Sequence, residues 1–483
     1  MRIDEYCRLD GLQLATLVRE NEVNGAELAE LASNACARIN PALNAIRELW
    51  TGGIDEIGRT DVDAPFYSVP FLLKDLSATA KGRLHECGSL LLNGEVAPSD
   101  SAFTAKCRLA GFNLVGRTAS PEFGWSASTE GRLSGITRNP WNPDRSAGGS
   151  SGGAAAAVAA GIVPVAHASD GSGSIRNPAS WCGLVGLKPS RGRISNAPAM
   201  GMPPGGRPVQ FIISRSLRDT AASLDALAGS VPGDPFEIAR PEQSFLAALN
   251  DGRRRLRIAF TTQAPSGGPV SADVVAATMR TVQALSEMGH RVEEARPIYD
   301  WDGLVNAILD TASAGIARRI DLICARKGIA PSADLIQHTT LAAYRHGKTL
   351  SAGDLIAAME YLDRLSRDVS PHFETYDVFL TPTSTCTAPP HLTHDADNAT
   401  ITARGWSDKI HAEDAFLLLA NVTGHPAITL PLHQGDDNLP IGLHLEARSG
   451  SEAVLFSLAA ELAEVFPWEH RSPPIHFAGL QDA

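Results

Sequence analysis

Residues 148–161 read GGSSGGAAAAVAAG, two serines between pairs of glycines followed by a run of alanines. Glycine loses much conformational entropy when it is fixed, so four glycines around two hydroxyls indicate an unusual backbone or a close approach. The alanines of residues 154–160 predict a closely packed helix that ends at Gly161. The segment therefore predicts that Ser150 and Ser151 are presented on a specialised backbone just before a buried helix.

Three other interpretations of these glycines and serines have to be weighed. GGSSG satisfies the G-x-S-x-G pattern of a nucleophile elbow, but residues 137–147 (TRNPWNPDRSA) contain two prolines and cannot form the central strand that this motif needs. The phosphate-loop motif is absent, and residues 170–176 (DGSGSIR) lack the third glycine of the dinucleotide-binding motif. A flexible glycine-serine loop remains open on this segment alone.

The composition limits the class of protein. Hydrophobic residues make up 43% of the 483 residues and charged residues 20%, as in a globular protein with a substantial core. The formal charge of −12 argues against a surface for nucleic acid or for an acidic membrane. Seven scattered cysteines without a C-x-x-C pair indicate neither a zinc ribbon nor a disulfide framework. With no secretion signal and no long apolar run, we expect a cytoplasmic protein without a membrane span.

Predicted strands and helices alternate along the chain. The first forty residues predict two helices, the second beginning near Asn24 and ending at Pro41. Further along, the pattern predicts buried strands at 67–73, 162–166, 255–260 and 376–383 and helices at 271–289 and 451–466. This alternation predicts the α/β class, and no linker divides residues 1–483 into separate domains.

A second serine framed by glycines follows the first pair. Ser174 lies within residues 169–180 (SDGSGSIRNPAS), and Lys74 ends the apolar segment 69–75 (VPFLLKD). A short helix and strand between the two serine segments could bring them into contact, so that the chain would hold a nucleophile, a relay and a base without any histidine. Taken alone, Lys74 fits a solvated lysine at the end of a strand better than a base, since lysines are nearly always exposed.

Residues 148–179 resemble the amidase signature family, whose long sequence pattern they fit at nearly every position. The flanking segments are similar to that family as well: VPFLLKD (69–75), GRTASPEFGWSASTE (116–130), TRNPW (137–141), GLVGLKPSRGRIS (183–195), YDVFLTPT (376–383), NVTGHPAITLPL (421–432) and LPIGLHL (439–445). The resemblance thus covers almost the whole chain. It implies one domain, with a mixed central β-sheet covered by helices on both faces, a triad-bearing core at about 60–200 and a variable, substrate-shaping region at about 200–420.

The resemblance implies a Ser–Ser–Lys triad in which Ser174 is the nucleophile, Ser150 the relay on a cis peptide bond and Lys74 the base. A serine hydroxyl needs a neighbouring base, and lysine can act as one only when burial and nearby positive charge bring its pKa to about 7–8. Ser150 can accept and donate a hydrogen bond at once, and Ser151 is expected to brace it. Asp170 is expected to form a supporting ion pair with Arg176.

The amides of Gly171, Ser172, Gly173 and Ser174 are expected to form the oxyanion hole. Ser172 departs from the family, which usually has glycine two residues before the nucleophile, and a left-handed backbone there would strain a serine. Ala147 also replaces the commoner proline or glycine before GGSSGG. Phe123, Trp125, Trp181, Met200 and Met202 are each expected in the core more often than in a pocket, although one or two could line an apolar acyl pocket.

The expected reaction is hydrolysis of a carboxamide through an acyl-enzyme, without a metal or organic cofactor. Residues 209–229 and 466–474 (FPWEHRSPP) are most similar to bacterial amidases of the 6-aminohexanoate-cyclic-dimer hydrolase type, which implies neutral, fairly apolar amides. Carbamates (urethanes) and esters share the acyl geometry. The expected partners are such a small substrate and, in a homodimer, a second copy of the chain.

Other functions stay open at this point. A glutaminase-type subunit of a tRNA-dependent amidotransferase would share the triad but would also need charged groups for the ends of glutamine. A non-catalytic binding protein on the same fold is disfavoured by the intact Lys74, Ser150 and Ser174. No metal site is expected, since H-E-x-x-H is absent and His391 and His394 lie in a turn-rich segment, where solvated side chains are expected.

Overall fold

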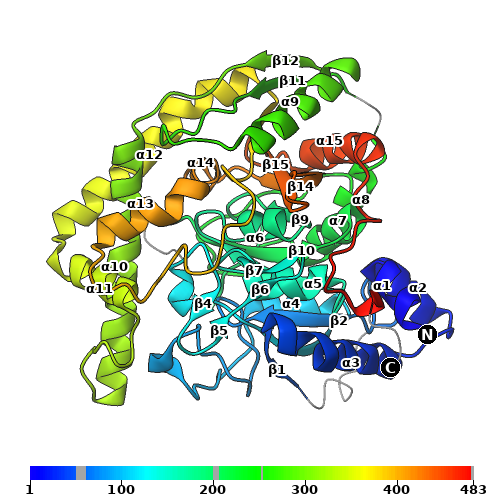
Figure 1. The fold of residues 1–483 in the computed structure, drawn as a ribbon, viewed down its shortest axis with the longest axis horizontal. Helices are drawn as coiled ribbons and strands as arrows, with labels where there is room; N and C mark the ends of the chain where they lie inside the picture. Colours follow the sequence, from blue (N-terminus) through cyan, green and yellow to red (C-terminus); the bar gives the residue numbers. More distant parts are fainter. Residues whose placement is uncertain (51–60, 199–205, 252–253, 480–483) are drawn as a thin grey trace.

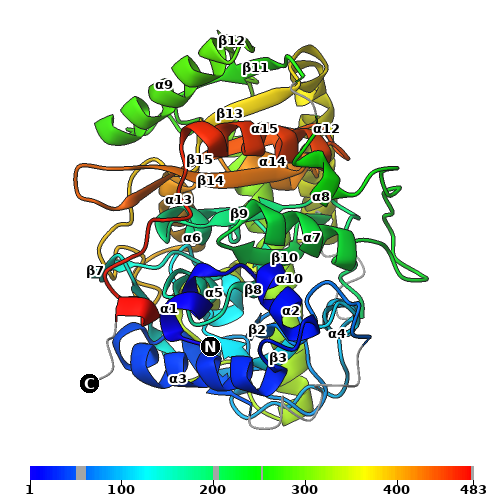
Figure 2. The same ribbon diagram turned by 90° about the vertical axis from the view of Figure 1, so that its right-hand side faces the viewer.

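A mixed β-sheet runs through the computed structural model, which describes residues 1–50, 61–198, 206–251 and 254–479. Within these residues eleven strands pair in the order β1-β3-β2-β8-β10-β9-β14-β15-β13-β11-β12. Figure 2 shows the strands succeeding one another from β12 at the top to β3 near the bottom. The strands are β1 (Ile46–Leu49), β2 (Pro70–Lys74), β3 (Asn113–Thr118), β8 (Val165–Asp170), β9 (Val185–Lys188), β10 (Val209–Ser214), β11 (Arg257–Phe260), β12 (Arg291–Glu294), β13 (Val378–Pro382), β14 (Ala427–Gln434) and β15 (Pro440–Ala447).

Helices cover both faces of this sheet, which confirms the predicted fold class. In Figure 1 the long helices α10 to α12 lie on the left and α1, α2, α7, α8 and α15 on the right. The helices are α1 (Ile3–Arg8), α2 (Gly11–Arg19), α3 (Gly25–Leu43), α4 (Ala102–Leu109), α5 (Gly152–Ala159), α6 (Arg176–Trp181), α7 (Leu217–Leu227), α8 (Phe245–Ala248), α9 (Ala272–Glu287), α10 (Trp301–Lys327), α11 (His338–Thr349), α12 (Ala352–Thr375), α13 (Ala403–Glu413), α14 (Leu418–Thr423) and α15 (Glu452–Val465). Short 3₁₀ turns are η2 (Leu90–Leu92), η3 (Glu122–Gly124) and η5 (Phe477–Gly479).

Strand direction places the predicted triad segments at one edge of the sheet. β2 runs parallel to β8, with Phe71 opposite Val165 and Leu72 opposite Ala166. The carboxyl ends of parallel strands meet at the same edge, so Lys74 at the end of β2 and Asp170 at the end of β8 lie on the same side. Every residue of these two strands is buried, as expected for strands packed on both faces.

The helix after the two serines packs without any exposed side chain. All eight residues of α5 are buried. A Cβ atom at Gly153 would lie 2.5 Å from the backbone nitrogen and oxygen of Ala119, so only glycine allows α5 to approach the end of β3 this closely. The short strands β6 (Arg138–Asn139) and β7 (Asn142–Ser146) precede it in a separate two-stranded sheet, and another small sheet joins β4 (Glu130–Gly131) to β5 (Gly135–Ile136). No central strand leads into Ser150, which agrees with rejecting the nucleophile elbow.

Most predicted elements are present, and two corrections concern the helices at the N-terminus. The Asn24 side chain accepts a hydrogen bond from the Glu27 amide at the predicted helix start, but the helix does not end at Pro41. It continues to Leu43 and ends at Asn44, whose left-handed backbone (φ 50°) closes the last turn. The helix prediction also missed that the first twenty residues form two helices, α1 and α2, rather than one.

The strand predicted at 162–166 is also displaced. β8 begins only at Val165, after Pro164, and extends through His167 to Asp170 because all six of its residues pair with β10. Polar residues at its end hid this extension from a search for apolar runs. The strands predicted at 67–73, 255–260 and 376–383 and the helices at 271–289 and 451–466 correspond to β2, β11, β13, α9 and α15.

Candidate active site

Lys74 lies at the centre of a cluster of serines. It is the last residue of β2 and only 1% exposed. Its Nζ atom lies 2.7 Å from Ser150 Oγ, 2.8 Å from Ser151 Oγ and 3.0 Å from Ser169 Oγ. The solvated interpretation of Lys74 is therefore wrong: the side chain is buried, and each hydrogen-bonding position of its amine faces a hydroxyl group.

Burial lowers the pKa of Lys74 from its usual value to about 7, while the negative charge of Asp170 opposes this shift. At neutral pH a substantial fraction of the amine is thus uncharged. An uncharged lysine amine has one lone pair and two N–H groups, so it can accept a proton from one hydroxyl while donating to the other two.

Ser150 is held by a backbone that only glycine permits. The Gly149–Ser150 peptide bond is cis, and Gly148 has a φ of 80°. A Cβ atom at Gly149 would lie 2.6 Å from the Ser128 amide nitrogen, and the Thr129 hydroxyl donates to the Gly148 carbonyl at 2.9 Å. Ser150 and its neighbours are buried, so the flexible-loop interpretation of this segment is wrong.

Ser151 and Ser169 hold the other side of Lys74. The Ser151 hydroxyl donates to the Ser169 carbonyl and accepts from the Ser169 amide, each at 3.3 Å. Ser151 thus contacts Lys74 and β8 and makes no hydrogen bond to Ser150 within the described residues. Ser169 was not singled out in the sequence. Its position directly before Asp170, at the end of a strand parallel to β2, is the signal that could have identified it.

Ser174 lies in the turn after β8 and is partly exposed. Among the described residues its hydroxyl makes no hydrogen bond, whereas Ser150 and Lys74 are joined to one another. The Gly173 amide donates to Asp170 Oδ1 at 2.7 Å and the Ile175 amide to Oδ2 at 3.2 Å. Gly173, which was expected to donate to an oxyanion, therefore points its N–H group to Asp170 in this structure.

Asp170 and Arg176 form a fully buried ion pair beneath this turn. Arg176 Nε lies 2.9 Å from Asp170 Oδ2, and its second nitrogen lies 3.1 Å from Oδ1. The Asn421 amide adds a hydrogen bond to Oδ1 at 2.9 Å. Burial alone would raise the pKa of Asp170, but Arg176 and Asn421 outweigh it and hold the pKa far below its usual value. The carboxylate thus stays charged and fixes the turn that carries Ser174.

Ser172 fits its position without a left-handed backbone. The residue of this turn with positive φ is Gly173 (φ 124°), so the possible strain at Ser172 does not arise. The Ser172 hydroxyl donates to the Gly171 carbonyl at 2.7 Å and accepts from Arg207 at 3.1 Å. The departure from glycine therefore adds a polar contact on the outer side of the nucleophile turn.

Apolar side chains border the serines. A Cβ atom at Gly124 would lie 3.2 Å from Ser150 Oγ and 2.7 Å from Leu76, and one at Gly173 would lie 2.6 Å from Leu417. The aromatic candidates divide: Phe123 and Trp125 are partly exposed near this region, whereas Trp181 is fully buried among Trp141, Ala388 and Leu439. Met200 and Met202 lie outside the described residues.

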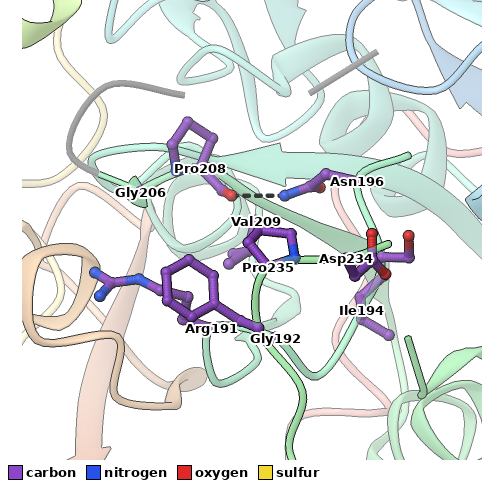
Figure 3. Close-up of a pocket in the computed structure, with 11 residues that line it drawn as sticks. Arg191, Gly192, Ile194, Asn196, Gly206, Pro208, Val209, Asp234 and Pro235 are labelled. Carbon is purple, nitrogen blue, oxygen red and sulfur yellow. Dashed lines mark hydrogen bonds between the residues drawn. The ribbon is translucent and has the colours of Figure 1, made fainter. Parts of the chain in front are cut away.

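A pocket lies close to the turn that follows β8 (Figure 3). Arg191, Asn196, Pro208 and Pro235 are among its lining residues, and the Asn196 amide donates to the Pro208 carbonyl at 3.0 Å. Pro208 connects this pocket to the turn, since its ring carbon lies 3.8 Å from the Cβ position of Gly171. The pocket contains none of the three predicted triad residues.

The two histidines considered for a metal site each contact another group of the protein. His394 is 1% exposed and lies 2.9 Å from Glu413, so the solvated interpretation is wrong for this residue. His391 lies 2.9 Å from the Pro143 carbonyl. Across residues 1–50, 61–198, 206–251 and 254–479, no group of three or more His, Cys, Asp or Glu side chains is placed to hold a metal ion. In the same ranges, no helix has the length and apolar character needed to span a membrane.

Comparison with known proteins agrees with this geometry. Residues 27–456 match the family model described as Amidase. The 6-aminohexanoate-cyclic-dimer hydrolase of Paenarthrobacter ureafaciens is 33% identical over 486 residues, covering 96% of each chain. A lipoamidase of Enterococcus faecalis is also 33% identical, and the chain spans 63% of that longer protein. A solved structure of a 6-aminohexanoate cyclic dimer hydrolase superimposes with a TM-score of 0.91 at 32% identity, covering 97% of this chain and 99% of the other.

The chain therefore belongs to the amidase signature family. It is a hydrolase that acts on carbon–nitrogen bonds.

Proposed function

We propose that the protein hydrolyses a carboxamide through an acyl-enzyme on Ser174, with Ser150 as the proton relay and Lys74 as the base. The observation that carries the proposal is the 2.7 Å contact between Lys74 Nζ and Ser150 Oγ at the end of two parallel strands, with the pKa of Lys74 near 7. A buried amine that is uncharged at neutral pH can take a proton, which an exposed lysine cannot do.

In the first half of the reaction, Ser174 Oγ forms a bond to the amide carbon as its proton passes to Ser150. The Ser150 proton passes at the same time to Lys74, which becomes the ammonium ion. When the carbon–nitrogen bond breaks, the proton returns along the same hydroxyl to the leaving amine. Water then attacks the acyl-enzyme by the same relay and releases the acid. Ser151 and Ser169 keep the amine of Lys74 in place throughout.

The oxyanion is assigned to backbone amides of the nucleophile turn. Within the described residues the amides of Ser172 and Ser174 make no hydrogen bond inside the protein, whereas that of Gly173 is bound to Asp170. The proposal therefore uses Gly171, Ser172 and Ser174 as donors and gives Gly173 a role in shaping the turn. Each such donor contributes about 3–4 kcal/mol to transition-state binding in comparable sites.

The substrate is proposed to be neutral and fairly apolar next to the scissile bond, because Leu76 and Leu417 border the serines. Carbamates, including urethanes, and esters present the same acyl geometry and belong to the proposal. Selectivity for the substrate is assigned to residues of the 200–420 region. Residues 1–483 are proposed to form a single catalytic domain, and two copies of the chain can form a homodimer. A reducing, cytoplasmic setting is supported by seven unpaired cysteines.

A hydrolysis screen over linear, aryl and cyclic amides, carbamates and esters tests the proposal, with the 6-aminohexanoate cyclic dimer of the relatives as one member. Hydroxylamine in the assay should divert the acyl group to a hydroxamate, after correction for its direct reaction with the substrate. Turnover that yields only the free acid at high hydroxylamine concentration would speak against the acyl-enzyme.

A further inference from the structure

Four arginines are buried in the described part of the chain, and one of them has no carboxylate partner. Charged groups are costly to bury unless they are paired, so an exception is informative. The exception is Arg207, which is 6% exposed. The three paired arginines are Arg117 with Asp75 and Glu86, Arg176 with Asp170, and Arg193 with Glu452.

Arg207 is attached to the nucleophile turn by one of its terminal nitrogens. That nitrogen donates to the Gly171 carbonyl and to Ser172 Oγ, each at 3.1 Å. The other terminal nitrogen has only long contacts, 3.3 Å to Thr311 Oγ1 and 3.5 Å to the Ile308 carbonyl. Its Nε is buried and has no hydrogen-bond partner among the described residues. The acceptors that this part of the chain offers to the guanidinium are therefore all neutral.

The edge of the Arg207 guanidinium formed by Nε and Nη2 has no carboxylate partner, although the same edge binds carboxylates in two other buried arginines. Arg176 holds Asp170 through Nε and Nη2, and Arg193 holds Glu452 through the same two nitrogens. In Arg207 these are the buried unpartnered Nε and the nitrogen with two long contacts. A carboxylate on this edge would form the two parallel hydrogen bonds that arginine makes with carboxylates.

The surroundings of Arg207 add the positive charge of Arg191. Burial and, to a smaller extent, the charge of Arg191 lower the pKa of Arg207 to about 10. His411 on α13 also faces this site: burial and then Arg207 lower its pKa to about 3, and its Nε2 is buried without a partner. No aspartate or glutamate contributes to the pKa of Arg207. The cluster is therefore prepared for an anion.

We propose that Arg207 binds a carboxylate group of the substrate and makes the enzyme selective for carboxylated amides. This inference rests on the proposed function. The part of the substrate that was proposed to be neutral and apolar is the part next to the scissile bond, and the carboxylate lies beyond it. Gly171 lies three residues before Ser174, so the chain between them spans at most about 11 Å. A carboxylate bound by Arg207 would therefore lie near the turn that carries Ser174.

The same charges distinguish this substrate class from glutamine. The α-carboxylate of an amino acid lies beside an ammonium group, which needs a negative partner. Arg191, Arg207 and His411 provide none. The carboxylate is therefore expected without a neighbouring ammonium, either at the far end of the acyl group, as in a monoamide of a dicarboxylic acid, or on the leaving amine.

Two series of matched substrates test the proposal and separate these sources. In the acyl series, mono-4-nitroanilides of dicarboxylic acids with four to seven carbons are each compared with an analogue that ends in an isopropyl group. In the amine series, acyl derivatives of 4-aminobenzoate are compared with those of 4-isopropylaniline. In one series, the wild type should favour the carboxylated member by about tenfold or more in kcat/KM, mainly through KM.

Arg207→Gln should abolish this preference, because kcat/KM for the carboxylated members should fall much further than kcat/KM for their neutral analogues. Arg207→Lys should restore part of it, since lysine keeps the charge without the planar pair of donors. Arg318→Gln, an exposed arginine on α10, is the matched control and should keep the full preference. As a measurement that needs no variant, adipate should inhibit hydrolysis of a neutral amide by the wild type competitively, and adipamide should do so much more weakly.

Two results would overturn the carboxylate site and leave the proposed function standing. In the first, the wild type hydrolyses neutral amides and shows no preference for the carboxylated members. In the second, Arg207→Gln lowers kcat/KM equally for both members of a pair, and adipate does not compete. The proposed function and this inference would be refuted together by another result. In that case the wild type hydrolyses no member of either series or of the wider screen, and a fluorophosphonate does not label Ser174.

Discussion

Two lysines lie fully buried in the central sheet, and only one of them touches serines. Lys74 ends β2 and Lys188 ends β9, with β8 and β10 between them. Burial lowers the pKa of each to about 7. By burial and pKa alone, the two amines are equally suited to act as bases at neutral pH.

The hydrogen-bond partners separate them. Lys74 contacts three hydroxyl groups, whereas the Lys188 amine donates to the Pro189 carbonyl at 3.0 Å. A hydroxyl can accept one proton and donate another, but a backbone carbonyl only accepts. Lys188 therefore has no route for a proton along that contact. The comparison shows that a perturbed pKa indicates a base only when a group able to pass a proton adjoins it.

The strongest test of this comparison removes the group at the far end of the Lys74 relay. Ser174→Ala should lower kcat by a factor of about a thousand or more, because the nucleophile is lost while the fold needs only a small side chain there. Ser190→Ala is the matched control: Ser190 is buried beside Lys188 and accepts from the Gly450 amide, so its loss should leave kcat within a few fold. Retention of more than about a tenth of the wild-type kcat by Ser174→Ala would refute the assignment.

The next test substitutes each of the two lysines. In the wild type, kcat/KM should rise with pH through about 7, because only the uncharged form of Lys74 accepts a proton. Lys74→Ala should lose this acid limb and most of the rate, and arginine should not rescue it, since guanidinium stays charged. Lys188→Met should keep the acid limb.

Profiles of kcat/KM from about pH 5 to 10 for the wild type and these variants provide the measurement, with the range set around the lysine pKa. If the limb disappears in Lys188→Met and persists in Lys74→Ala, the roles assigned to the two lysines are reversed.

A smaller effect is expected from Ser169, the serine that distinguishes the Lys74 cluster from a simple pair. Ser169→Ala removes the 3.0 Å contact to the amine and should lower kcat/KM about tenfold, as expected for one hydrogen bond to a group that becomes charged. Steady-state kinetics with a neutral amide measure it, and Ser223→Ala, a buried serine on α7, controls for general loss of packing. Unchanged kinetics would show that Ser150 and Ser151 alone position the amine.

In stability, the two lysines should behave alike. A lysine with an ordinary pKa near 10.5 when unfolded and about 7 when folded binds more protons in the unfolded state between these values, so the free energy of unfolding rises with pH over that window. Lys74→Met and Lys188→Met should each flatten this rise and increase the Tm at pH 7 by a few degrees. Thermal unfolding at pH 7 and 9 measures both. A decrease in Tm for only one variant would show that its amine stabilises the fold.

The three residues proposed as the triad could be picked out from the sequence because each lies in a contiguous motif. Ser150 and Ser174 are framed by glycines, and Lys74 follows an apolar strand, so local sequence carries the signal. Lys188 lies in an equally recognisable segment, GLVGLKPSRGRIS, yet its partner could not be read from it. Which atoms face a buried amine depends on neighbouring strands.

Residues that act across strands were missed for the same reason. Arg207 reaches Ser172 because β10, which begins two residues later, runs antiparallel to β8 and returns the chain to the nucleophile turn. That pairing joins residues more than thirty positions apart and leaves no local pattern. Pro41 and His394 were misjudged by residue preference, since a helix can continue for a short distance past a proline and a buried glutamate can hold a histidine.

The network around Asp170 also has a consequence for how the protein is made. Its partner Asn421 lies 251 residues further along the chain, and Arg176 reaches His444 at a separation of 268 residues. During synthesis from the N-terminus, all three triad residues emerge long before these partners, and a buried ion pair that lacks its neighbours is costly. The turn that carries Ser174 is therefore completed only when the last strands, β14 and β15, have joined the sheet. Incomplete chains released from the ribosome would contain Lys74, Ser150 and Ser174 but would lack the contacts that Asn421 and His444 make with the Asp170–Arg176 pair.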